Sequence, residues 1–511
     1  MQVKQSFDNY AYIYKDVFDI IYIRQRGEKM NVKKHTIVLL FFASIVLGFT
    51  GAYAGGQLAK KGSFGQSADQ NSNEKVIIDS PEHLSKVTQA YHLIKEHFLE
   101  DVEDEDLIEG AIQGMLESLD DPYSSYMDAE VMESFNEQIE SSFEGIGAEV
   151  SSVDGIVTII APIKESPAEK AGLRPNDQII KIDEKNVEGY DLNDAVDLIR
   201  GEKGTEVVLE ILRPGVSEPF EVTVVRDEIP IETIHASIVE ENDQKTGIIA
   251  ITSFSETTAG DFMEALDDME SSQIDGLVID VRGNPGGLLN SVEDILQAFV
   301  PKDLPYVQTE DQQGNKQPFY SDIDEKKDYP IAVLIDSGSA SASEILAVAL
   351  KEIGYEVIGE TSHGKGTVQQ AVPLGDGTTL KLTFYKWLSP KGTWIHEKGV
   401  EPTIEAQQPD YYYSHPIQTD EPLTVNQSGE AVENVQTILT GLGYDLQDDE
   451  TGYFGEGTVD AVKAFQQAHE LPVNGEIDAR TAELIERELV EKIRAGEDDT
   501  QLEEAIKSLY N

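Results

Sequence analysis

Apolar segments of strand length alternate with helical segments between residues 230 and 405, and this alternation constrains the fold most strongly. The expected strands are Gly247–Phe254, Gly276–Val281, Ile331–Asp336, Tyr355–Gly359 and Leu380–Trp387. Such alternation is typical of an α/β domain. A chain of 511 residues has room for three or four domains, so this core is only part of the molecule.

An almost wholly apolar stretch, Thr36–Gly51, follows Lys33 and Lys34. Counted as residues 36–54, it approaches the roughly 20 residues that span a bilayer. Basic residues on its N-terminal side favour a cytoplasmic position for residues 1–35 and export of the rest. Ala52-Tyr53-Ala54 also fits a signal-peptidase site. We therefore expect either a single-pass membrane protein with an extracytoplasmic catalytic part, or a secreted protein cleaved after Ala54.

Residues 1–29 carry acidic and aromatic residues that are unusual ahead of an export signal. Met30-Asn31-Val32-Lys33-Lys34 is a more typical signal start, so we expect Met30 to be the initiator. An N-terminal peptide from residues 1–29 in protein isolated from cells would contradict this expectation.

Acidic residues dominate the composition, with 96 Asp and Glu against 39 Lys and Arg and a formal net charge of −57. This balance argues against nucleic-acid binding, which needs clustered basic residues to neutralise phosphates. It indicates a strongly charged, soluble surface. The chain has no cysteine, which excludes a thiol nucleophile, thiolate metal ligands and disulfides.

Three serines in the run Ser339-Ala340-Ser341-Ala342-Ser343 lie between an expected strand and the expected helix Glu344–Lys351. Lys365 follows the next strand. A serine hydroxyl is a poor nucleophile until a base takes its proton, and a desolvated lysine can be that base. The pattern indicates a serine enzyme, but the residues alone leave the three serines in competition, since Ser343 could simply cap the helix.

Three ordered blocks resemble the carboxyl-terminal processing, or tail-specific, proteases over roughly residues 81–405. They are Asp280–Gly287 (DVRGNPGG), Ser339–Ile345 (SASASEI) and Gly364–Gln370 (GKGTVQQ). The resemblance implies Ser341 as nucleophile, Lys365 as general base and Gln369 as the residue that positions the lysine. It also suggests a homodimer.

The residues agree with these roles. At a strand-to-helix junction, unpaired N–H groups favour a developing oxyanion, and the expected donors are Ala342 and either Gly286 or Gly287. For Lys365 to act as a base, its pKa must fall from about 10.4 to roughly 7–8, which burial can cause. In a flat strand Gln369 would lie about 13 Å from Lys365, so we expect a bend or bulge at Gly366.

Other chemistries fit less well. His363 would allow a Ser–His pair, but no acid is marked as its partner and there is no G-x-S-x-G elbow. His396-Glu397 lacks the second histidine of a zincin, and we expect no metal or organic cofactor. Gly359–Lys365 nearly fits a P-loop, but Gly366 stands where Ser or Thr must hold Mg²⁺.

Residues 143–228 resemble a PDZ domain of the bacterial protease type, with Gly172-Leu173-Arg174-Pro175-Asn176-Asp177 as a typical block. The resemblance implies capture of a peptide as an added strand. The loop Gly145, Ile146, Gly147 and Ala148 would bind the peptide's terminal carboxylate. A generic small β-domain whose glycines only make turns is the alternative. Ser166-Pro167-Ala168-Glu169, with Gly172 beyond it, specifies a very short capped helix.

The remaining domains are expected at residues 55–80 (linker), 81–142 (helical part of the protease, with a turn at Asp121-Pro122-Tyr123-Ser124), 229–410 (protease core), 411–421 (linker), 422–490 and 491–511. Residues 422–490 show three apolar helix faces and resemble the three-helix peptidoglycan-binding module. Residues 491–511 are expected to form a charged helical tail with no readable task.

The sequence therefore predicts a multidomain α/β protein: an N-terminal membrane segment, a helical segment, a β-rich PDZ domain, an α/β protease core and a C-terminal three-helix module. Its expected function is that of an exported serine endopeptidase acting on unfolded or tail-exposed proteins with accessible C-termini. Its expected partners are peptidoglycan and, through the N-terminal helix, the membrane. An inactive scaffold that binds peptides and cell wall is the alternative.

Overall fold

The computed structural model describes residues 84–153, 155–417, 421–447, 449 and 451–511. The expected membrane segment 36–54, the linker 55–80 and the expected start at Met30 lie outside the described residues. Within the described part, no helix is both long and apolar enough to cross a membrane. The chain divides into two units between residues 92 and 93, within α3 (Leu84–His97).

A six-stranded sheet contains four of the five expected strands. Its order is β10 (Ile234–Glu241), β11 (Gln244–Ile251), β12 (Gly276–Asp280), β15 (Ile331–Ile335), β16 (Glu356–Gly359) and β19 (Ile404–Glu405). The pair β10–β11 is an antiparallel hairpin, and the other pairs are parallel. The central strands β12 and β15 are apolar, apart from Asp280 at the end of β12, and both faces of the sheet are covered.

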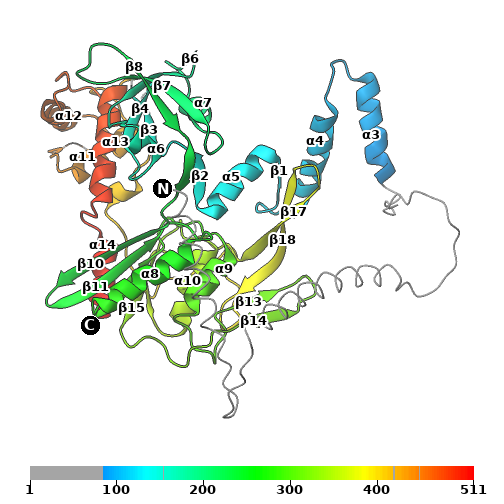
Figure 1. The fold of residues 1–511 in the computed structure, drawn as a ribbon. Coiled ribbons are helices and arrows are strands. Elements are labelled where there is room, and N and C mark those ends of the chain that lie inside the picture. Colours follow the sequence, from blue (N-terminus) through cyan, green and yellow to red (C-terminus); the bar gives the residue numbers. More distant parts are fainter. Residues whose placement is uncertain (1–83, 154, 418–420, 448, 450) are drawn as a thin grey trace, which may run out of the picture. The chain divides into compact units, whose positions relative to one another are not determined.

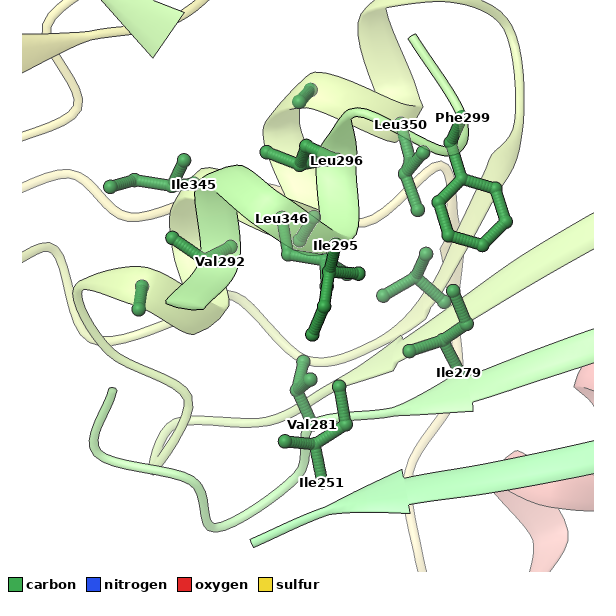
Figure 2. Close-up of a cluster of buried hydrophobic side chains, with 14 of the residues drawn as sticks. Ile251, Ile279, Val281, Val292, Ile295, Leu296, Phe299, Ile345, Leu346 and Leu350 are labelled. Carbon is green, nitrogen blue, oxygen red and sulfur yellow. The ribbon is translucent and has the colours of Figure 1, made fainter. Parts of the chain in front are cut away.

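One face of the sheet is covered by α8 (Thr258–Ser271), α9 (Leu289–Leu296) and α10 (Ala342–Glu352). Figure 2 shows this layer, with Ile279 and Val281 of the sheet side facing Ile295 and Leu346 of the helices. These side chains are fully buried, and burying each one stabilises the fold by about 1.5–3 kcal/mol.

The other face is covered by α14 (Thr500–Leu509), the red helix next to the C-terminus in Figure 1. Ala505 and Leu509 pack against Val278, Leu334 and Ile358. The end of the chain is helical, as expected, and it is part of the core, a role that could not be read from the sequence. Because α14 contributes few apolar residues, its pattern could not be told from that of a solvated helix.

A second sheet holds the fifth expected strand, β18 (Thr379–Leu388). β18 pairs with β17 (Thr367–Pro373), β13 (Val307–Glu310) and β1 (Ser125–Met127), and β13 pairs with β14 (Lys316–Phe319). β1 lies between α4 (Asp104–Glu117) and α5 (Ala129–Glu140), so residues 81–142 are not wholly helical as expected. This segment therefore contributes a strand to the sheet that contains β17, the strand that follows Lys365.

The chain enters and leaves the expected PDZ region through a two-stranded ribbon of β2 (Ser142–Gly145) and β9 (Asp227–Pro230). Between them lie α6 (Pro167–Lys170), α7 (Leu192–Ile199) and the sheet β3 (Ala148–Val153), β4 (Ile156–Pro162), β5 (Gln178–Ile182), β7 (Glu206–Leu212) and β8 (Phe220–Val225), with β6 (Lys185–Asn186) beside β5. The Ser166 hydroxyl caps α6 by accepting the N–H of Glu169 at 3.3 Å, as its sequence specifies.

The C-terminal region begins with a 3₁₀ turn, Asp410–Tyr413, and continues as α11 (Glu430–Gly441), α12 (Glu456–Ala468) and α13 (Ala479–Arg494). The three apolar faces expected from the sequence meet in one core around Val435, Phe465 and Ile485. Tyr411 of the preceding linker is also buried in this core.

Candidate active site

Ser341 lies between β15 and α10, at the N-cap of that helix. Its backbone has φ 55° and ψ −112°, a conformation that residues other than glycine rarely adopt. Its N–H donates to the Glu344 carboxylate at 2.8 Å. The Ser341 side chain therefore stands at a helix N-terminus, where free N–H groups and the helix dipole favour negative charge.

The three serines of this run have different surroundings. Ser339 and Ser343 are fully buried, and their hydroxyls donate to the carbonyls of Val281 at 2.7 Å and Asn284 at 2.9 Å. Ser341 is only partly buried and lines a cavity of about 320 Å³. Two of the serines thus serve the scaffold, while the third faces a space that a substrate can enter.

The same cavity is lined by Lys365, Gln369, Gly286, Gly287 and Ala342. All six residues expected around the scissile bond, including Ser341, therefore meet in one place, although they come from three separate blocks of sequence. The rest of the lining is largely apolar and comes from α5, α9, α10, β17 and β18: Phe135, Ile139, Leu289, Ile345, Val368 and Trp387.

Lys365 immediately precedes β17, and its surroundings favour the neutral amine. Burial lowers its pKa, and the positive charge of Lys381 on β18 lowers it further, while Asp121 and Glu344 act in the opposite direction. Its Nζ lies 5.0 Å from the centre of the Tyr123 ring. A lysine whose pKa is lowered in this way is more often neutral, and so is better suited to accept a proton, than a solvent-exposed lysine.

Gln369 reaches the cavity because β17 is irregular. A β-bulge lies between Val368 and Gln369, whereas the sequence led us to expect the irregularity at Gly366. A bulge re-aims the side chains that follow it. The Gln369 amide donates to the hydroxyls of Thr367 at 2.9 Å and Thr383 at 3.1 Å.

The glycine loop approaches the nucleophile closely. A Cβ added to Gly286 would lie 2.8 Å from the Cβ of Ser341 and 3.0 Å from the nitrogen of Ala342, and its φ of 103° favours glycine. The Gly286 N–H donates to the Asn284 side chain at 2.8 Å. The sequence left Gly286 and Gly287 as alternative oxyanion donors beside Ala342. Because the Gly286 N–H is already hydrogen-bonded, Gly287 is the favoured donor.

Glu344 is a site residue that the sequence reasoning missed. Its fully buried carboxylate accepts four hydrogen bonds. Their donors are the backbone N–H groups of Ser341 (2.8 Å), Gly364 (2.6 Å) and Lys365 (2.8 Å) and the hydroxyl of Ser362 (2.6 Å). It thereby ties the backbone of the candidate nucleophile to that of the candidate base. A Ser-x-x-Glu capping pattern was the available signal.

Neither of the competing chemistries gains support. His363 is exposed and is not part of the described cavity lining. Lys365 leads into the strand β17, whereas the lysine of a P-loop opens a helix. Among the described residues, no cluster of three or more His, Asp or Glu could hold a metal ion.

The loop expected to bind a peptide carboxylate lies where β2 ends and β3 begins. Gly145 is the last residue of β2, Ile146 is buried, and Ala148 opens β3. The carbonyls of Ile146 and Gly147 accept the N–H groups of Ala168 and Ile163. β3 is an edge strand of its sheet, with β4 as its only sheet neighbour in the described structure.

An α/β core that holds a serine at a helix N-terminus, a desolvated lysine and a close glycine loop in one cavity defines a serine peptidase. Comparison with known proteins agrees. The model of peptidase family S41 matches residues 245–406, the PDZ domain residues 158–213, the putative peptidoglycan binding domain residues 428–485, and the activating protease CtpB N-terminal domain residues 45–131.

Similar whole proteins carry the same description. The carboxy-terminal processing protease CtpB of Bacillus subtilis (strain 168) is 49% identical over 482 residues, covering 94% of this chain and 100% of that protein. The protease CtpA of the same organism is 43% identical, covering 83% and 90%. A probable CtpA-like serine protease of Staphylococcus saprophyticus is 35% identical, covering 84% and 87%. The chain belongs to the carboxy-terminal processing serine proteases of peptidase family S41.

Proposed function

We propose that this protease is exported and cleaves unfolded or tail-exposed proteins with a Ser341–Lys365 dyad. The observation that carries the proposal is that Ser341, unlike Ser339 and Ser343, shares a cavity with a lysine whose pKa is lowered by burial. A substrate must enter this cavity as an extended segment, so folded proteins without a free tail are excluded.

The first chemical step forms the acyl-enzyme. The neutral Lys365 amine takes the hydroxyl proton of Ser341 while its Oγ attacks the scissile carbonyl carbon. The carbonyl electron pair moves to the oxygen, which the N–H groups of Ala342 and Gly287 bind. The carbon–nitrogen bond then breaks, and the leaving amine takes the proton from the Lys365 ammonium.

The second step releases the product. Lys365, neutral again, takes a proton from a water molecule that attacks the acyl carbon, and the ester bond to Ser341 breaks as Oγ recovers a proton from Lys365. Gln369 acts as a positioning residue for the lysine throughout. The partly apolar cavity favours an apolar substrate side chain beside the cut.

Loss of casein digestion in the Lys365→Ala variant tests the dyad. The exposed Lys398→Ala is the matched control, since it removes a lysine outside the cavity. We expect digestion to be lost in the first variant and kept in the second. Full digestion by Lys365→Ala would refute the role of Lys365 as the general base.

The PDZ domain would recognise the C-terminus of the substrate. In the described structure its strand β3 has a sheet neighbour on one side only, which leaves the other edge for a peptide to pair with as an added strand. The carbonyls of Ile146 and Gly147 already accept hydrogen bonds from within the domain. This arrangement leaves the loop Gly145–Ala148 to offer N–H groups to a terminal carboxylate. Binding of a peptide with a free C-terminus, and not of its amidated form, is the expected result in calorimetry.

The C-terminal module would hold the enzyme at peptidoglycan, and the apolar segment 36–54 would anchor it in the membrane or direct its secretion. A homodimer would form through α3 and α4, in which no residue is buried although apolar side chains are exposed. The most exposed apolar side chains of these two helices are Val87, Leu93, Ile108 and Met115. The rival from another class is an inactive scaffold, which has no need of a desolvated lysine beside a serine.

A further inference from the structure

The turn Asp121–Ser124 contacts Lys365, which lines the cavity, although the turn belongs to the segment ahead of the PDZ insert. The pairing of β1 with β18 holds the turn in place, with Ser125 opposite Lys381. The Ser124 hydroxyl accepts the N–H of Thr383 at 3.1 Å and donates to Asp121 at 2.6 Å. The turn is thus bonded to the strand beside β17.

A chain of hydrogen bonds connects Asp121 to Gln369. The Gln369 amide donates to the Thr383 hydroxyl at 3.1 Å, and that hydroxyl donates to the Asp121 carboxylate at 2.7 Å. Because the Thr383 proton is given to Asp121, the Thr383 oxygen is left to accept from Gln369. The carboxylate therefore fixes the direction in which the Gln369 amide points.

The same turn covers Lys365. The Tyr123 ring centre lies 5.0 Å from the Lys365 Nζ, at which distance a ring face attracts a cation and shields it from water. Burial opposes ionisation of Asp121, but hydrogen bonds from Ser124, Thr383 and the Tyr123 backbone outweigh it and hold the pKa of Asp121 below its usual value. Asp121 is therefore a negative charge at neutral pH.

We propose that the turn Asp121–Ser124 is a positioning element for the protease reaction, with Asp121 directing Gln369 through Thr383 and Tyr123 holding Lys365. This inference rests on the proposed dyad. A turn that only joined α4 to β1 would need neither an ionised side chain aimed at Thr383 nor an aromatic ring against the lysine.

The charges around Lys365 give the proposal a specific pH signature. Lys381 of β18 favours the neutral amine, whereas Asp121 of the turn and Glu344 of α10 favour the ammonium. His396 and Glu397 lie on the loop next to Tyr123. The Asp121 charge raises the pKa of Lys365, so removing it lowers that pKa. The acidic limb of the kcat/KM profile, which follows this pKa, therefore moves to lower pH.

The test compares Asp121→Asn and Thr383→Val with Asp128→Asn in the full chain, with fluorescein-labelled casein as substrate. Asp128 caps α5 by accepting the Val131 N–H at 2.8 Å, and asparagine caps equally well. We expect Asp121→Asn to lower kcat roughly 10- to 100-fold with little change in KM and to shift the acidic limb to lower pH. Thr383→Val should lower kcat without moving the limb, and Asp128→Asn should change neither.

Two results would overturn the proposal. One is an unchanged kcat and pH profile in Asp121→Asn while Lys365→Ala is inactive. This result would show that the turn does not position the dyad, while the dyad itself still stands. The other is a lower melting temperature in Asp121→Asn with wild-type kcat per folded molecule and an unmoved limb, which makes the turn purely structural. Activity in Lys365→Ala would instead refute the dyad itself, so the two failures are distinguishable.

Discussion

Four hydrogen bonds converge on the Glu344 carboxylate, and this one residue connects Ser341 to Lys365 through their backbones. In Glu344→Gln the new NH₂ group must face N–H donors, which leaves buried groups unpaired. We expect a loss of about 2–4 kcal/mol in the free energy of unfolding, measured in urea, together with strongly reduced casein digestion. Glu264→Gln, at an exposed position of α8, should change neither. Wild-type stability in Glu344→Gln would contradict this role.

The charge of Lys381 gives a second prediction at the residue scale. In the proposed dyad Lys365 is a neutral base, so activity should rise with pH through its lowered pKa. Lys381 contributes to that lowering, so Lys381→Gln raises the Lys365 pKa and moves the acidic limb of kcat/KM to higher pH. A limb that stays in place, or moves to lower pH, would show that Lys381 does not face the base.

Sequence reasoning brought together the residues of the three blocks but not those that support them. Ser341, Lys365 and Gln369 were accessible because short motifs carry their chemistry. Glu344 was hidden among 96 acidic residues, and Asp121 and Lys381 lie in segments without a motif. The bulge was expected at Gly366 but lies between Val368 and Gln369. The need to bring Gln369 close to Lys365 requires the chain to bend between them, but it does not say at which residue.

At the scale of elements, α14 shows how a chain end can complete a distant core. Asp499, at its N-cap, accepts two hydrogen bonds from Arg282 at 2.8 Å each, and Arg282 also pairs with Asp280. Arg282 lies just before the glycine loop of the active site. Helix propensity could predict a helix here, but the apolar face of α14 is short. Nothing local marks its partner, a sheet whose central strands β12 and β15 lie far earlier in the chain.

The packing of α14 gives a prediction about stability. Leu509 is 9% exposed and packs against the sheet, so Leu509→Ala should lower the free energy of unfolding by about 2–4 kcal/mol. Lys507→Ala, on the solvent side of the same helix, should cost less than about 0.5 kcal/mol. Urea unfolding of both variants measures the difference. Equal effects would mean that α14 is not part of the core.

The exposed faces of α3 and α4 lead to a prediction about assembly. Replacing Ile108 and Met115, seven residues apart on one face of α4, by Asp should convert a dimer to a monomer in sedimentation experiments. Gln113→Asp, at an exposed position on another face, is the control. A wild-type chain that sediments as a monomer would remove the dimer from the account.

At the scale of the whole molecule, the C-terminal module (residues 422–490) is inserted between two segments that belong with the protease core. The chain leaves the core at Tyr411 and returns near Asp498, whose carboxylate accepts the Tyr411 hydroxyl at 3.0 Å. Deletion of residues 422–490 should therefore abolish peptidoglycan pull-down while casein digestion persists. Undiminished pull-down would refute wall binding by this module.

The most direct test of the central claim is casein digestion by the full chain and its Ser339→Ala, Ser341→Ala and Ser343→Ala variants, with and without added C-terminal peptides. Ser339 and Ser343 bond to the scaffold, whereas Ser341 faces the cavity with Lys365. We predict that, among the variants that fold, only Ser341→Ala loses the ability to cleave casein. Cleavage that survives in Ser341→Ala, or is absent from the wild type under every condition, would contradict the account.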